Sequence, residues 1–286
     1  MEDASMNIDY AKLRQDVLVS TKWLEENLAA RDIRIVDTRK EDSYSASHIP
    51  GSVSLRGSPF LRENSHVITP ESFALLMGTI GVGEHTTMIA YDDGNNLFAG
   101  RLWWVARYYG HQNVKILDGG WDAWSAEQRP MTSEAPNVVP SVFIPRPRHD
   151  LIASSAYVQD AIGKRNIQLL DVRGNDEWNR EENIGDTIAG HIPGARHIVW
   201  TDVIDSATKR FRSGDDLHRI FIEAGLEAGV EVIPYCQGGV RAAHTMAALH
   251  VAGFGPIRNY EGSWGAWSKL GTEIEKNNSK KRGIYV

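Results

Sequence analysis

The chain has 286 residues, of which 42% are hydrophobic, so it can bury the cores of two domains of about 130 to 150 residues each. Its formal net charge of −6 argues against broad affinity for nucleic acid, because such affinity depends on excess Lys and Arg. The sequence has one cysteine, which excludes an intramolecular disulfide framework and a multi-cysteine metal site. We expect no metal and no other cofactor.

The sequence also indicates the cellular compartment of the protein. No segment approaches the length of about 20 apolar residues that a membrane-spanning helix needs. Residues 1–14 carry acidic and basic side chains in place of the apolar core of a signal peptide. A lone thiol is best preserved in a reducing compartment. The sequence therefore predicts a cytoplasmic protein with no membrane partner.

The chain contains an internal duplication. The segment IRIVDTR at 33–39 recurs as IQLLDVR at 167–173, and later blocks keep the same order. These later blocks are HIPG at 48–51 and 191–194, IGV at 80–82 against AGL at 224–226, and GWDAW at 120–124 against SWGAW at 263–267. The period is too long for a repeat array, so each copy is predicted to be a complete domain. The second copy has an insertion near 175–188.

The duplication predicts the domain organisation. We expect an N-terminal domain over residues 1–130 and a C-terminal domain over 151–286. Residues 131–150 are rich in proline, which predicts an extended connector. Within each copy, short apolar runs alternate with amphipathic segments of helix length. This pattern is typical of an α/β domain with a parallel sheet and helices on both faces.

Individual elements can be predicted in chain order. Thr69 and Pro70 predict a helix start, with threonine as the N-cap and proline at the first helical position. Ser154 or Ser155 predicts the cap of a helix that runs to Ile162. The predicted strands are 33–37, 88–91 and 114–117 in the first copy, and 167–171, 232–235 and 257–260 in the second.

The cysteine stands at a position where ligands bind. Cys236 follows the strand predicted at 232–235, and ligands of open α/β sheets bind at the carboxyl ends of the strands. It is followed by a loop and a strong helix-forming segment, the loop being Gln237, Gly238, Gly239, Val240 and Arg241. The glycines allow successive N–H groups to point at one centre, and the arginine and the helix dipole add positive charge. Because all three features favour a thiolate, Cys236 is the predicted nucleophile.

At these residues the chain resembles the tandem-domain rhodanese family of sulfurtransferases. The resemblance covers nearly the whole chain, through the Asp-x-Arg strand ends, the HIPG turns, the cysteine loop and the Trp-x-x-Trp segments. It implies two rhodanese-like domains and a persulfide on Cys236. The donor it implies is a small anion, thiosulfate or 3-mercaptopyruvate, and the acceptor is cyanide or a thiol.

Two arginines are predicted to hold the donor. The resemblance implies that Arg173, at the end of the strand 167–171, helps to bind the donor's oxyanion. Its equivalent in the first copy is Arg39, so pairing with a neighbouring carboxylate stays open as an alternative. Arg241 is predicted to bind the donor through its position in the first turn of the helix.

The loop departs from two known forms of the family. Mammalian thiosulfate enzymes have Arg-Lys after the cysteine and threonine where this chain has Arg241. Mercaptopyruvate enzymes commonly have Gly-Ser-Gly there, with the serine implicated in proton handling. This chain has no serine in the loop, so we expect thiosulfate as the donor and keep 3-mercaptopyruvate as the alternative.

The first copy lacks the nucleophile. Alignment of 88–91 with 232–235 places Asp92 where the second copy has Cys236. A carboxylate cannot accept sulfane sulfur, so the N-terminal domain is predicted to be catalytically inactive and to close over the loop of the second domain. Among other side chains, His244 is expected to be packed against neighbouring elements or solvated rather than to abstract a proton, and Trp178 is expected to form a pocket wall.

Two other functions fit parts of the pattern. A cysteine-dependent phosphatase or arsenate reductase also combines a cysteine, an amide loop and an arginine. Its loop is longer than the four residues found here between Cys236 and Arg241. The other alternative is a non-enzymatic binding module built from inactive rhodanese domains, and the retention of the cysteine, both glycines and the arginine argues against it.

Overall fold

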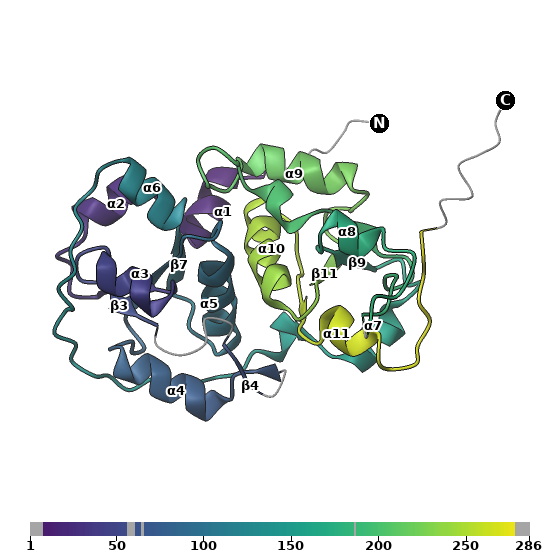
Figure 1. Cartoon of the computed structure of the whole chain (residues 1–286), viewed down its shortest axis with the longest axis horizontal. Helices are drawn as coiled ribbons and strands as arrows, with labels where there is room; N and C mark the ends of the chain where they lie inside the picture. Colours follow the sequence, from purple (N-terminus) through teal and green to yellow (C-terminus); the bar gives the residue numbers. More distant parts are fainter. Residues whose placement is uncertain (1–7, 56–60, 64–65, 186, 278–286) are drawn as a thin grey trace.

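The structure is a computed structural model, and it describes residues 8–55, 61–63, 66–185 and 187–277. Two α/β domains lie side by side along the long axis of the molecule (Figure 1). Among the described residues, every helix is too short or too polar to cross a bilayer.

The N-terminal domain is built on a five-stranded parallel sheet with the order β1-β7-β6-β2-β3. In that order the strands are Leu18–Val19, Val114–Leu117, Thr87–Tyr91, Ile33–Asp37 and Val53–Ser54. The predicted strands 33–37, 88–91 and 114–117 are therefore confirmed.

The C-terminal domain repeats this order. Strands β10, β9 and β11 form one parallel group and β12 and β8 another, and a bridge between Val232 and Ile257 connects the two groups. The resulting order β8-β12-β11-β9-β10 matches that of the first domain. The strands are Ile152–Ala153, Asn259–Tyr260, Glu231–Tyr235, Ile167–Asp171 and Arg196–His197. The last predicted strand, 257–260, is shorter than expected.

Eleven helices of the described residues cover these sheets. In the N-terminal half they are α1 Tyr10–Val17, α2 Thr21–Glu26, α3 Glu41–Ala46, α4 Pro70–Thr79, α5 Leu97–Tyr108 and α6 Gly120–Ala126. In the C-terminal half they are α7 Ser155–Ala161, α8 Asn175–Trp178, α9 Gly214–Glu223, α10 Val240–Val251 and α11 Ser263–Trp267. Short 3₁₀ turns lie at His149–Leu151 and Trp200–Val203.

The predicted helix starts are confirmed. The Thr69 hydroxyl accepts a hydrogen bond from the N–H of Ser72, and Pro70 begins α4. The Ser154 hydroxyl accepts one from the N–H of Tyr157 and caps α7. Both bonds satisfy backbone donors that a helix leaves free in its first turn.

Alternate residues of each strand face opposite layers of helices. In β2, Val36 belongs to a core shared with α4 and α5, whereas Ile35 belongs to a core shared with α2 and α6. The C-terminal domain divides in the same way, with Leu170 facing α9 and α10 and Leu169 facing α7 and α11. Helices therefore cover both faces of each sheet, as predicted.

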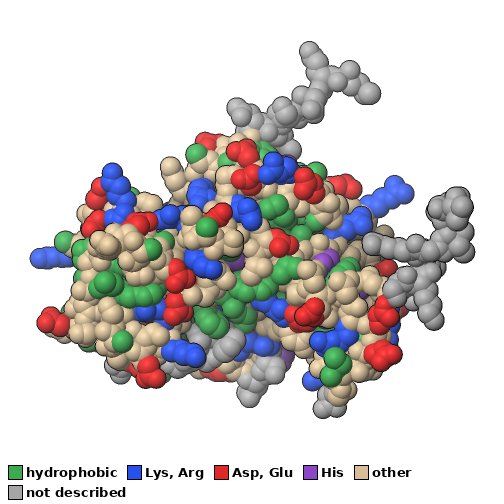
Figure 2. All heavy atoms as spheres, turned by 45° about the horizontal axis from the view of Figure 1, so that its top comes forward, with side chains coloured by type: hydrophobic (Ala, Val, Ile, Leu, Met, Phe, Trp, Pro, Cys, Tyr) green, Lys and Arg blue, Asp and Glu red, His purple; other side chains and the backbone are tan. Residues whose placement is uncertain are grey.

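The domains meet through α5 and α10, the two helices that follow Asp92 and Cys236. Both are buried along nearly their whole length, and their apolar residues share one core. The crossing is close, because a Cβ at Gly100 would lie 2.9 Å from the Cα of His244. A band of hydrophobic side chains crosses the middle of the face shown in Figure 2.

Each domain also extends a segment toward the other. A short antiparallel hairpin of the N-terminal domain, β4 Arg62–Glu63 and β5 His66–Val67, reaches the loop after β11. In the opposite direction, the N–H of Phe211 donates to Asp118 of the N-terminal domain (2.9 Å). Helix α1 lies against α9 and α10, and Arg14 donates to the carbonyl of Arg212 (2.8 Å).

The proline-rich connector follows the surface of the N-terminal domain. Backbone N–H groups of Ser141 and Arg146 donate to the carbonyls of Gly78 and Tyr109, both at 2.9 Å. Residues 133–148 form no helix or strand. The connector is therefore extended, and backbone bonds hold it in place.

Candidate active site

Cys236 lies at the carboxyl end of β11, where the sequence predicted a ligand site. Its side chain is buried, and its N–H donates to the hydroxyl of Ser263 (3.1 Å). The thiol borders a cavity of about 630 Å³ between the two domains. The cavity is lined by Arg62, His66 and Leu97 of the N-terminal domain and by Cys236, Gln237, Gly238, Val240, Arg241, Gly262, Gly265, Ala266 and Lys269 of the C-terminal domain.

Three carbonyl groups of the loop are hydrogen-bonded to the segment that begins with β12. Those of Cys236, Gln237 and Gly239 accept hydrogen bonds from residues 259–265, at 2.9, 2.9 and 3.0 Å. The C=O and the N–H of a trans peptide point in opposite directions. The N–H groups that follow these carbonyls therefore point away from that segment, as the amides of an anion-binding loop do.

Both glycines of the loop have close neighbours, and Gly239 also has a backbone conformation that favours glycine. Gly239 has a φ of +81°, a left-handed conformation that other residues rarely adopt. A Cβ at Gly239 would also overlap the carboxylate of Glu261. A Cβ at Gly238 would lie 2.5 Å from Nη1 of Arg62. Any side chain at either position would force the loop or its neighbours to move.

Arg241 lines the cavity, but a carboxylate neutralises its charge. Its Nη1 and Nη2 donate to the two oxygens of Glu177 at 2.5 and 2.9 Å. Burial opposes the charged forms, yet this pairing raises the pKa of Arg241 and lowers the pKa of Glu177. Arg241 also interacts with Cys236. The sequence analysis missed Glu177, although it lies in the recognised insertion.

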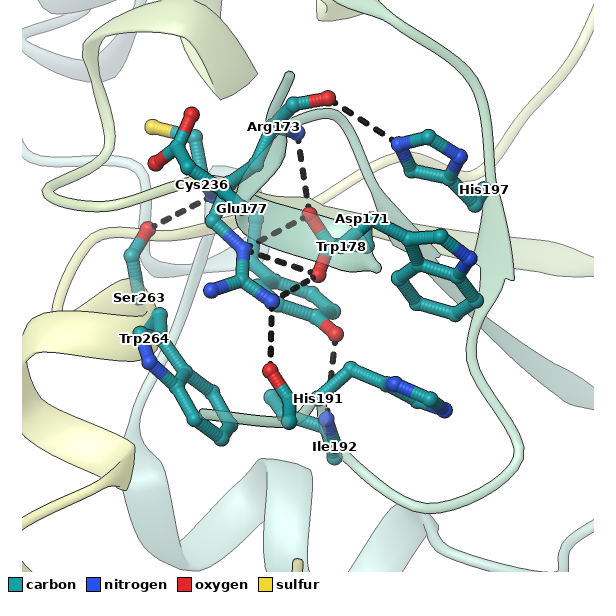
Figure 3. A network of polar contacts seen from close by, with 12 residues as sticks. Asp171, Arg173, Glu177, Trp178, His191, Ile192, His197, Cys236, Ser263 and Trp264 are labelled. Atoms are coloured by element: carbon teal, nitrogen blue, oxygen red, sulfur yellow. Dashed lines mark hydrogen bonds and ion pairs between the residues drawn. The ribbon is translucent and has the colours of Figure 1, made fainter. Parts of the chain in front are cut away.

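The structure shows Arg173 in the alternative arrangement, paired with a neighbouring carboxylate. Its guanidinium is buried and donates to Asp171 at 2.7 and 3.0 Å and to the carbonyl of Gly190 at 2.8 Å. It also lies over the ring of Trp264, 4.6 Å from the ring centre (Figure 3). Arg173 is absent from the cavity wall. Arg39 binds Asp37 in the same way, so the shared Asp-x-Arg pattern encodes a buried ion pair.

Trp178 does not line the cavity at Cys236 either. Its ring stacks between those of His191 and His197, with centre-to-centre distances of 3.8 and 4.6 Å (Figure 3). His244 is buried at the crossing of α5 and α10, where its ring stacks on that of Phe211. Of the two expected arrangements, packed or solvated, His244 therefore shows the packed one.

The cavity also includes groups that the sequence analysis did not find. Arg62 and His66 come from the hairpin of the other domain, and Lys269 follows α11. Arg62 and His66 carry no local signal in the sequence, because the docking of the two domains brings them to the loop. Among the described residues, no cluster of histidine, cysteine, aspartate and glutamate is suited to hold a metal ion.

The equivalent loop of the N-terminal domain is filled by its own side chain. The two carboxylate oxygens of Asp92 accept hydrogen bonds from the N–H groups of Gly94, Asn96, Phe98 and Ala99, at 2.7 to 2.9 Å. Burial raises the pKa of Asp92 to about 6, while these four bonds act in the opposite direction. In the N-terminal domain, the backbone amides of this loop therefore bind an oxyanion, which is the carboxylate of Asp92.

The repeated sheets and the cysteine loop define a tandem α/β protein in which one of the two domains carries a cysteine. Residues 20–127 and 154–270 each match the rhodanese-like domain. The chain therefore belongs to the rhodanese family.

Similar proteins span nearly the whole chain. A putative thiosulfate sulfurtransferase of Haloferax volcanii is 35% identical, over 95% of this chain and 99% of its own. The thiosulfate sulfurtransferase of Corynebacterium glutamicum is 32% identical, over 94% and 93%. Among solved structures, SseA of Escherichia coli, described as a 3-mercaptopyruvate sulfotransferase, has a TM-score of 0.77 and 28% identity, over 86% of this chain and 98% of its own.

Proposed function

We propose that this protein is a sulfurtransferase that moves sulfane sulfur from thiosulfate to cyanide or a thiol through a persulfide on Cys236. The observation that carries this proposal is a cysteine at the cavity between the domains, in a loop whose carbonyls bind the segment 259–265 and whose N–H groups therefore point the other way. An amide loop of this kind stabilises an anion at a fixed position. A persulfide attached to Cys236 is such an anion.

The proposed reaction has two steps. The thiolate of Cys236 attacks the outer sulfur of thiosulfate, a new S–S bond forms, and sulfite leaves with the electron pair of the broken S–S bond. Cyanide then attacks the outer sulfur of the persulfide, so thiocyanate leaves and the thiolate is restored.

The charge of the cavity favours a dianionic donor. Among the described residues, Lys269 has no carboxylate within salt-bridge distance, and Arg62 shares Glu261 with Arg101. The wall is therefore positive even though Glu177 neutralises Arg241. Sulfite leaves without needing a proton, so thiosulfate requires no proton donor in the site. No hydroxyl side chain lines the described cavity. The positive wall and the lack of a hydroxyl group both support thiosulfate as the donor.

His66 supports 3-mercaptopyruvate as a second candidate donor. Loss of sulfur from that substrate leaves a carbanion that must take up a proton, and His66 lines the cavity. Histidine is the side chain best suited to proton transfer near neutral pH. The ratio of initial rates with the two donors decides between them.

The division of labour between the domains is part of the proposal. We assign residues 1–130 to an inactive domain, because Asp92 fills its amide loop, and residues 151–286 to the catalytic domain, with the connector 131–150 between them. The lone cysteine is best maintained in the cytoplasm.

The proposal is tested by mixing the protein with thiosulfate and cyanide and measuring thiocyanate. Initial rates with thiosulfate and with 3-mercaptopyruvate are then compared at equal concentrations, and a phosphate ester is the control substrate. Intact mass after exposure to the donor should rise by about 32 Da, the mass of one sulfur atom on Cys236. Release of phosphate without formation of thiocyanate would overturn the assignment.

A further inference from the structure

A buried charge cluster connects the N-terminal domain to the back of the cysteine loop. Arg101 lies on α5 and is fully buried, and its guanidinium donates to both oxygens of Glu261 at 2.7 Å. Glu261 follows β12 in the other domain and is 4% exposed. Nε of Arg62 lies 3.4 Å from the same carboxylate. Two arginines of one domain therefore bind one carboxylate of the other.

This cluster contacts both glycines of the loop. The carboxylate of Glu261 lies against Gly239, and the guanidinium of Arg62 lies against Gly238. Arg101 also donates to the carbonyl of Leu61, next to Arg62 in the chain (3.4 Å). The position of the loop thus depends on groups that belong to the N-terminal domain.

The equivalent acid of the first domain also contacts the other domain. Asp118 follows β7 as Glu261 follows β12, and it is buried. It accepts a hydrogen bond from the N–H of Phe211 (2.9 Å) and is paired with Arg14. An acid at this position therefore takes part in the domain interface in both halves of the molecule.

We propose that Arg101 and Glu261 are positioning residues for sulfur transfer: through them, the domain that lacks a cysteine fixes the amide loop of the domain that has one. This inference rests on the proposed function. A bidentate arginine–carboxylate pair has a defined geometry, which a hydrophobic contact of the same size lacks. Glu261 of the pair contacts Gly239 directly.

The test separates positioning from stability. Replacing one partner of a buried ion pair is strongly destabilising, whereas replacing both with apolar residues of similar size is often neutral. We therefore expect Arg101→Met to lower the midpoint of urea unfolding and the double variant Arg101→Met/Glu261→Met to recover it. A misplacement of about 1 Å can cost about 100-fold in rate, so kcat should fall about 10- to 100-fold in both variants. The rate at which iodoacetamide labels Cys236 should rise in both.

The controls keep the proposal falsifiable. Arg39→Met removes one partner of a buried ion pair that lies wholly within the N-terminal domain, so it should lower the unfolding midpoint but leave kcat and the labelling rate unchanged. If Arg101→Met does not fold, Glu261→Gln keeps the size of the side chain and should give a smaller loss of kcat. Recovery of kcat together with the unfolding midpoint in the double variant would overturn the inference.

Failure of the proposed function has a different signature. If the wild-type protein forms no thiocyanate, the proposed activity is wrong. The labelling rate of Cys236 in Arg101→Met still tests the positioning role in that case. An unchanged labelling rate contradicts it.

Discussion

Glu177→Gln tests whether the carboxylate limits the electrostatic role of Arg241. The substitution keeps the size of the side chain and an oxygen that can accept from the N–H of Gly174, but it removes the negative charge paired with Arg241. An exposed ion pair contributes about 0–1 kcal/mol, and breaking a buried one costs about 3–5 kcal/mol. The two side chains are 21% and 28% exposed, so we expect the free energy of unfolding to fall by about 1–2 kcal/mol.

The same substitution should improve donor binding. It leaves the guanidinium of Arg241 unneutralised at the cavity wall, so the site gains one positive charge. For each unit of negative charge on a donor about 6 Å from the altered group, Coulomb's law gives about 0.7 kcal/mol in water and about 3 kcal/mol at an effective dielectric constant of about 20. The cavity is open to solvent, so we expect the KM for thiosulfate to fall about 3- to 10-fold with kcat little changed.

The assay is steady-state formation of thiocyanate at low and high ionic strength, together with urea unfolding. The decrease in KM caused by Glu177→Gln should become smaller as the salt concentration rises, because salt screens charges in contact with water. Asp176→Asn is the matched control, since Asp176 is the exposed neighbour of Glu177 on α8. An unchanged or higher KM for Glu177→Gln at low salt would refute this account of the site.

Three further predictions follow from single side chains. Cys236→Ser should abolish formation of thiocyanate and leave the urea midpoint nearly unchanged, and surviving turnover would eliminate the single-nucleophile scheme. Arg173→Met should lower the free energy of unfolding by about 3–5 kcal/mol, because it strands the buried carboxylate of Asp171, while the KM for thiosulfate stays the same at temperatures where the variant is folded. Burial lowers the pKa of His244 to about 3 in the folded protein. As the pH falls, His244 is therefore protonated in the unfolded chain before it is protonated in the folded one. Stability from His244 is therefore full above about pH 6.5 and declines below it, by about 1.4 kcal/mol between pH 7.5 and 5.5. His244→Phe should remove this part of the pH dependence of urea unfolding, and an unchanged pH profile would contradict the assignment.

Much of the fold could be predicted because its signals are local. The strands 33–37 and 167–171 are mainly apolar, each with one polar residue at its second position and an acid at its end, and their observed bounds match the prediction. Thr69 and Ser154 each provide a side-chain oxygen within one helical turn of the N–H that it accepts from. The cysteine loop could be located for the same reason, since the strand, the glycines and the helix are consecutive.

The missing parts of the site depend on contacts between distant residues. Arg101 and Glu261 are 160 positions apart, and no pattern in either segment identifies the partner. Arg173 shows a second limit, because a sequence gives the position of a guanidinium but not the direction in which it points. A carboxylate two residues earlier, at Asp171, is within reach and binds it in the interior.

The placement of α1 has a consequence for the molecule as a whole. This helix precedes the first repeat in the chain, yet Tyr10 lies so close to Gly214 of α9 that a Cβ there would be 2.6 Å from it. Half-molecules cut within the connector would lose this contact and would also expose the Ala-rich surface of α10 to water. Each of the two domains therefore depends on the other for part of its buried surface, and the protein should unfold in one cooperative transition on heating.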